Sequence, residues 1–146
     1  MSFEEGPFVQ AACFCDTVLQ ETAGVFSLIR VVDTVEQSAT GPNPPHEMPA
    51  FTIRLKMVIM LKSGSALGRR DLKIVPQLPT KETKDPLIYS VHFEGEEKGH
   101  NFLIDFGFTL EHEGVYWFKI YIADENEENI LTSIPLRAKY NRQITK

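Results

Sequence analysis

Residues 101–122 read NFLIDFGFTLEHEGVYWFKIYI and indicate two β-strands joined by a turn. Apolar side chains occupy every second position: Phe102, Ile104, Phe106, Phe108 and Leu110 before the turn, and Tyr116, Phe118, Ile120 and Ile122 after it. This period is typical of a strand with one buried and one wet face. Residues 111–114 supply the turn, and a third strand is expected near residues 130–136. The pattern therefore predicts three consecutive strands.

Similar patterns occur elsewhere in the chain. Residues 51–61 alternate most cleanly, and further strands are expected at 7–15, 25–35, 72–78 and 87–93. A helix is the alternative for residues 11–20, but Thr17 and Val18 are poor helix formers and no amphipathic stripe appears. The segments 7–15 and 25–35 are apolar on both faces, which is typical of a strand covered on both sides. Between the strands, 63–68 and 94–99 look like a loop and a turn.

About eight short strands and no convincing helix predict an all-β fold, a single antiparallel β-sandwich. The proline-rich segment 36–49 is expected to be a loop crossing between two sheets; the alternative, a linker between two domains, would leave each side too small. A closed barrel is the other architecture considered. Pro76 and Pro135 favour open sheets, because proline suits an edge strand. The predicted domain spans 7–140, between a flexible N-terminus (1–6) and a C-terminal tail (141–146).

Composition narrows the classes of function. The chain has 146 residues, 42% of them hydrophobic, and a formal charge of −5. A chain of this length buries roughly 70% of the surface that it exposes when unfolded, so neither a disulfide nor a metal is needed for stability. The acidic balance argues against a nucleic-acid binder. No secretory signal and no apolar run of about 20 residues is present, so no membrane is expected as a partner.

Two cysteines indicate the compartment. Cys13 and Cys15 are two positions apart, which on a strand separates their Cα atoms by roughly 6.5–7 Å, too far for an easy disulfide. Both are expected to be reduced, in a cytoplasmic protein. Buried strand cysteines are usually small core residues, and Cys15 has no basic neighbour that would activate it as a nucleophile.

No motif amounts to a metal or catalytic site. The histidines, at positions 46, 92, 100 and 112, are scattered and lack zinc-site spacing. Asp124, Asn126 and Glu128 match alternate positions of a calcium loop, but Asn129 replaces the required glycine and Pro135 the bidentate glutamate. A solvated hairpin tip is the better interpretation, and no cofactor or metal is expected.

A small basic cluster, Arg69, Arg70 and Lys73, lies near the start of a strand. It could hold a phosphate or an acidic partner. A solvated edge whose charges prevent strand-to-strand aggregation explains it better.

Several short segments form a recognisable set: FCD at 14–16, Gly24, SLIR at 27–30 and VD at 32–33, with EGVYWF at 113–118 and IPL at 134–136 near the C-terminus. Together they resemble the corresponding segments of a group of small bacterial proteins of unknown function. The resemblance implies a sandwich of immunoglobulin-like or C2-like type. It implies no catalytic residue.

A candidate interaction surface lies opposite the core face of residues 115–122. If Tyr116 and Phe118 are buried, Trp117, Lys119 and Tyr121 point outward, and Trp and Tyr are enriched in binding hot spots. A covering loop, residues 36–50, is the alternative. The leading interpretation is a non-catalytic protein-interaction or assembly module whose partner is another protein or a second copy. The alternative is a small ligand-binding sandwich, C2-like or carbohydrate-binding-like, that uses its end loops; a hydrolase ranks third.

Overall fold

The computed structural model describes residues 5–145, which form seven β-strands and no helix, so the all-β prediction is confirmed. The strands are β1 (Phe8–Gln20), β2 (Phe26–Val32), β3 (Thr34–Gly41), β4 (Phe51–Gln77), β5 (Leu87–Leu110), β6 (Gly114–Ala123) and β7 (Glu128–Ile144). The expected flexible N-terminus lies outside the described residues for positions 1–4, as does Lys146 of the expected tail.

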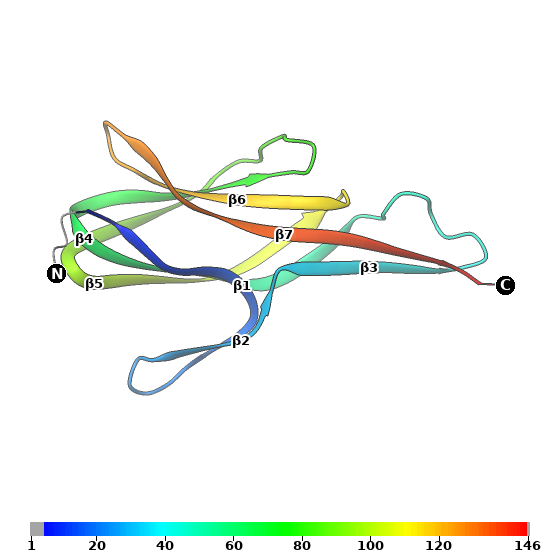
Figure 1. Cartoon of the computed structure of the whole chain (residues 1–146), viewed down its shortest axis with the longest axis horizontal. Helices are drawn as coiled ribbons and strands as arrows, with labels where there is room; N and C mark the ends of the chain where they lie inside the picture. The colour runs from blue at the N-terminus through cyan, green and yellow to red at the C-terminus, as the bar shows by residue number, and fades with distance from the viewer. Residues whose placement is uncertain (1–4, 146) are drawn as a thin grey trace.

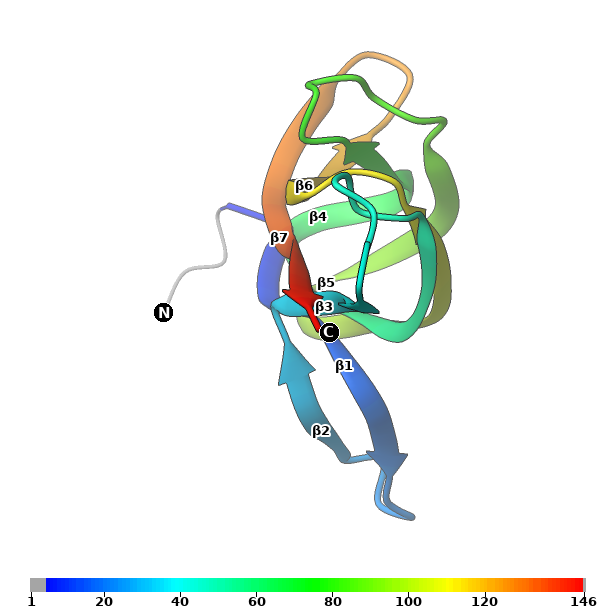
Figure 2. The ribbon, with the colours of Figure 1, turned by 90° about the vertical axis from the view of Figure 1, so that its right-hand side faces the viewer.

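One sheet contains all seven strands (Figures 1 and 2). Its order is β2-β1-β4-β6-β7-β3, and β5 pairs with β4 outside this path. Five strand pairs are antiparallel, but β3 runs parallel to β7 from Thr34↔Arg137 to Gly41↔Ile144. The prediction of a purely antiparallel arrangement is therefore wrong for this pair.

A long bent hairpin of β4 and β5 organises the sheet. It pairs from Phe51↔Leu110 to Ile74↔Leu87, with register irregularities only between Lys62 and Leu67. The first part of β4 also pairs with β1, and its last part pairs with β6. The expected loop at 63–68 and the turn at 94–99 are therefore strand segments where this hairpin bends.

Glycine makes the bend possible. Gly64 has φ +60° and Gly68 φ +88°, a backbone region that glycine enters without strain. A Cβ at Gly64 would also collide with the backbone of Glu5 and the ring of Phe8, which lie against the bend. The bulges change which side chains face inward, from odd-numbered residues such as Ile59 to even-numbered ones such as Leu72.

The strand boundaries correct three further predictions. The segment expected as one strand at 25–35 is divided near Asp33 into β2 and β3. Residues 36–41 of the expected crossing loop belong to β3 and pair with the backbone of β7, so the loop itself is shorter than predicted. β7 continues to Ile144, so residues 141–144 belong to the sheet and not to a tail.

The hydrophobic core lies on the inner side of the bent sheet. Phe14 of β1 is fully buried and contacts Phe118 edge-to-face, with ring centroids 5.1 Å apart, and Phe106 at 5.4 Å. Pro76 pairs with β6 beyond the last β5 pair, and Pro135 precedes the first β3 pair. Each proline thus has a ladder partner on one side only, which suits a residue without an N–H donor.

Candidate functional site

The outer face of β6 carries the side chains predicted as an interaction surface. Trp117 is 38% exposed and Lys119 and Tyr121 are half-buried, whereas Tyr116 and Phe118 are buried. The predicted inner and outer faces of β6 are confirmed. Among the described residues 5–145, no segment covers Trp117 completely, and residues 36–41, part of the loop expected to cover it, pair with β7 instead.

Neighbouring strands extend this outer face. Trp117 lies between Gln77 and Pro135, and Tyr121 lies between Lys73 and Ile130. Ile130 is exposed, while Lys73 forms an ion pair with Glu128 at 2.8 Å. The face thus combines exposed apolar area with a few charges, as protein-binding surfaces do.

A second apolar surface lies on the β1–β2 hairpin, residues 16–31, which projects from the rest of the molecule (Figures 1 and 2). Pairing of β1 with β4 ends at Cys15, so beyond this point β1 and β2 pair only with each other among the residues that the structure describes. Two-stranded hairpins are at best marginally stable in water. The part of the chain that the structure describes therefore provides no third strand or covering face of the kind that such a hairpin usually needs.

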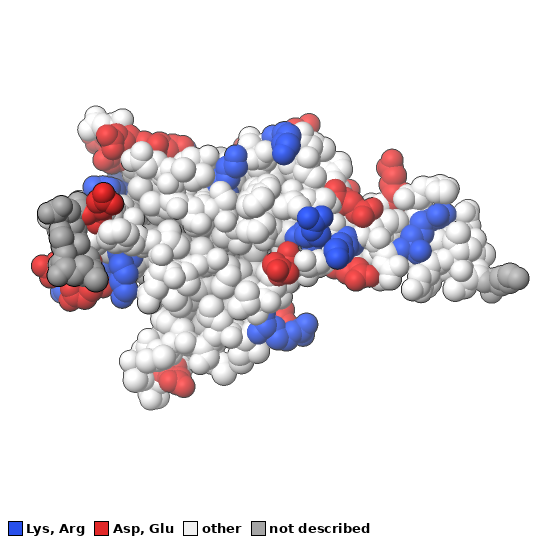
Figure 3. Space-filling model, viewed as in Figure 1, with Lys and Arg blue, Asp and Glu red and all other residues white. Residues whose placement is uncertain are grey.

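Several large apolar side chains of this hairpin are exposed. Leu19 is 50% exposed, Ile29 40% and Val31 63%. The main charges near its base are Asp16 and Arg30, which pair at 3.1 Å. The space-filling view also shows few charged side chains across the middle of the face over β1 (Figure 3). The sequence predicted that both faces of residues 25–35 would be covered by other parts of the protein. This is wrong for β2, whose side chains are exposed or half-buried.

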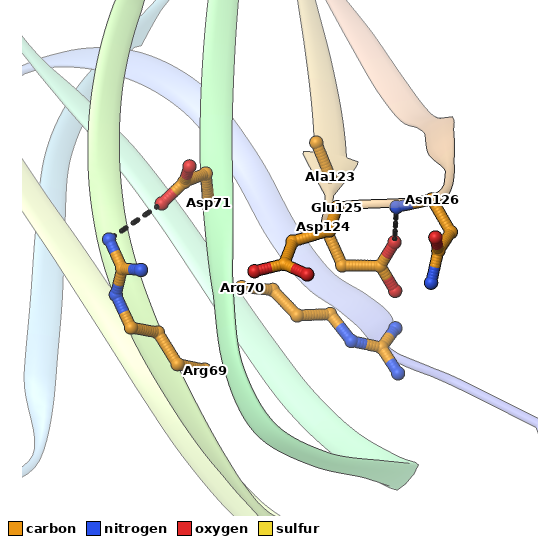
Figure 4. Close-up of a pocket in the computed structure, with 7 residues that line it drawn as sticks. All are labelled: Arg69, Arg70, Asp71, Ala123, Asp124, Glu125 and Asn126. Carbon is orange, nitrogen blue, oxygen red and sulfur yellow. Dashed lines mark hydrogen bonds and ion pairs between the residues drawn. The ribbon is translucent and has the colours of Figure 1, made fainter.

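The two weak ligand-site candidates of the sequence meet in one hollow. Arg69 and Arg70 of β4 line it together with residues 123–126, at the end of β6 and in the turn that follows, around a volume of about 490 Å³ (Figure 4). Arg69 pairs with Asp71 at 3.3 Å, and Arg70 extends beneath the turn that carries Asp124. Basic and acidic side chains both line this hollow, so it offers no cluster of one charge that would bind an anion or a cation.

Asp124 stabilises its own turn. Its Oδ1 accepts hydrogen bonds from the backbone N–H groups of Asn126 and Glu127, both at 2.8 Å. These bonds lower the pKa of the exposed Asp124 carboxyl, with a smaller contribution from the charge of Arg70. A carboxylate used in this way acts as a turn-forming group.

The other polar candidates are dispersed. Cys13 and Cys15 are free thiols, and burial raises the pKa of each. The four histidines are all exposed, at separate places in the sheet and loops. Within residues 5–145, no three His, Cys, Asp or Glu side chains are placed to hold a metal ion. No helix long and apolar enough to cross a membrane occurs in that part of the chain.

No protein-family model matches the chain, and a search of curated proteins found no match.

Proposed function

We propose that this chain is a cytoplasmic, non-catalytic β-sandwich of immunoglobulin-like or C2-like type that works as a protein-interaction and assembly module. The observation that carries the proposal is the projecting hairpin 16–31. It has only two strands and exposes Leu19, Ile29 and Val31. A partner that supplies a third strand or an apolar face would remove this surface from water, and burial of apolar area is the main driving force for association.

The outer face around Trp117 is the second surface of this proposal. It differs from the hairpin because a well-paired sheet supports it, with β4 on one side of β6 and β7 on the other. The partner is a protein or a second copy of the chain. The free thiols Cys13 and Cys15 suit a reducing compartment and support the cytoplasmic assignment.

The test is hydrogen exchange of the hairpin amides, combined with sedimentation across a range of protein concentrations. In dilute monomer, the amides of residues 17–31 should exchange far faster than those of β4. Assembly should protect them.

The double variant Leu19→Ser/Val31→Ser should keep the melting temperature within a few degrees and lose the assembly. Leu67→Ser is the control, because Leu67 is an apolar residue that is even more exposed, at 68%, but lies away from both surfaces, at the bend of β4. A hairpin that is fully protected in the dilute monomer would refute the proposal, because it would need no partner.

A further inference from the structure

An apolar groove lies along β5, separate from both interaction surfaces. It has a volume of about 400 Å³ and is lined from both arms of this strand. The apolar lining residues are Leu87, Tyr89, Ile104, Phe106 and Phe108, with Pro76 of β4. In the described part of the chain β5 pairs only with β4, so its other edge is open. The groove is therefore a place where the sheet leaves part of the core accessible.

The lining matches a small-molecule site in size and chemistry. Such sites usually have 300–1,000 Å³, mostly apolar and aromatic walls and a few polar groups. Phe106 and Phe108 stack with ring centroids 5.6 Å apart and an interplanar angle of 11°, which gives the groove a flat wall. The half-buried side chains of Leu87 and Tyr89 belong to the opposite arm.

The charges at the groove are balanced. Lys84 and Asp85 are adjacent in the chain, and neither forms an ion pair within residues 5–145. Asp105 is paired with Lys56. An ionic head group would thus lose hydration without meeting a net opposite charge. An uncharged group that donates to Asp85 and accepts from Lys84 would satisfy both.

We propose that this groove binds an uncharged amphiphile, a molecule with an alkyl or aryl body and a polar end that both donates and accepts hydrogen bonds. The body would lie against Phe106, Phe108 and Ile104. The polar end would lie at Lys84 and Asp85. This site is independent of the proposed assembly function.

The experiment uses three probes with the same ten-carbon tail, decanamide, decanoate and decylammonium, below their micellar concentrations. Each competes with the uncharged fluorophore N-phenyl-1-naphthylamine for the full chain. Decanamide should bind at least about tenfold more tightly than either ion. Within an amide series, affinity should rise about fourfold for each added methylene until the groove is filled.

Adjacent residues on opposite faces of β5 provide the matched control. Ile104→Trp should fill the groove and weaken decanamide binding at least about tenfold, and Leu103→Trp, on the outer face, should change it less than about twofold. Leu87→Trp fills the groove from the other arm if Ile104→Trp melts too low to assay. Lys84→Glu should shift the preference to decylammonium.

Three results would overturn the proposal: equal affinity for the amide and an ion, equal loss in Leu103→Trp and Ile104→Trp, or displacement only by extended apolar peptides. The last would assign the open β5 edge to strand docking. The hairpin variant Leu19→Ser/Val31→Ser should bind decanamide normally, so failure of the assembly proposal leaves this one testable.

Discussion

Two isoleucines on β7 allow the inner and outer faces to be compared by the same chemical change. Ile134 is 4% exposed and pairs with Phe118, whereas Ile130 is 54% exposed and pairs with Tyr121. Truncating a buried isoleucine to alanine costs about 2–5 kcal/mol, which combines lost burial with the cavity left behind. We expect about 3 kcal/mol for Ile134→Ala and about 1 kcal/mol or less for Ile130→Ala.

Urea titration at fixed pH measures both losses. For a domain of this length, about 3 kcal/mol corresponds to a fall of roughly 6–12 °C in melting temperature. The m-value should stay constant in both variants, because neither change alters the surface exposed on unfolding. Sedimentation of Ile130→Ala should show weaker association, because that residue extends the Trp117 face. Equal destabilisation by the two changes would refute the assignment of faces on β7.

Three other predictions follow from single groups. Tyr116→Phe removes the hydroxyl that accepts hydrogen bonds from the backbone N–H groups of Glu111 at 3.1 Å and His112 at 3.0 Å. A thermal melt should show a loss of stability of about 1–2 kcal/mol, and an unchanged stability would contradict these two hydrogen bonds. Burial raises the pKa of Cys15, so the folded state favours the neutral thiol, and the free energy of unfolding should fall as pH rises above about 8.5. Urea titrations at several pH values should show a weaker fall with pH in Cys15→Ala. Because the pKa of Asp124 is lowered in the folded state, its carboxylate contributes to folding stability above about pH 4, and this contribution is lost as pH falls through the folded pKa. The difference in stability between the parent chain and Asp124→Asn should therefore narrow in acid. Millimolar calcium should not raise the melting temperature.

Local periodicity was enough to assign most strands and their faces. The alternation that placed Tyr116 and Phe118 inside and Trp117 outside depends only on neighbouring residues, because successive side chains on a strand point to opposite sides. Pairing is a different matter. A glycine such as Gly64 or Gly95 is equally typical of a turn between two strands and of a bulge within one strand. The sequence therefore could not show that both glycines lie in continuous strands.

The strand β3 was missed for a related reason. Its half-buried positions are Val35, Gln37, Ala39 and Gly41, too small or polar to show an apolar alternation. Its partner β7 begins about a hundred residues later, and parallel pairing over that separation has no local signal. The sequence does not indicate the β5 groove, because Ile104 and Phe108 have the same alternating pattern as ordinary core residues. Only the topology shows that the strand has an open edge there.

The long hairpin also constrains how such a chain can change in evolution. Because β4 and β5 remain paired on both sides of the bend, a residue inserted into one arm would shift the pairing beyond it by one position. Side chains such as Ile59 or Leu72 would then lose their partners or turn toward water, since a slip of one residue reverses every face. Length changes should therefore be tolerated within these strands only as matched pairs, one in each arm. The turn at 21–25 lies outside the paired residues of β1 and β2, so a change in its length should leave the strand registers intact.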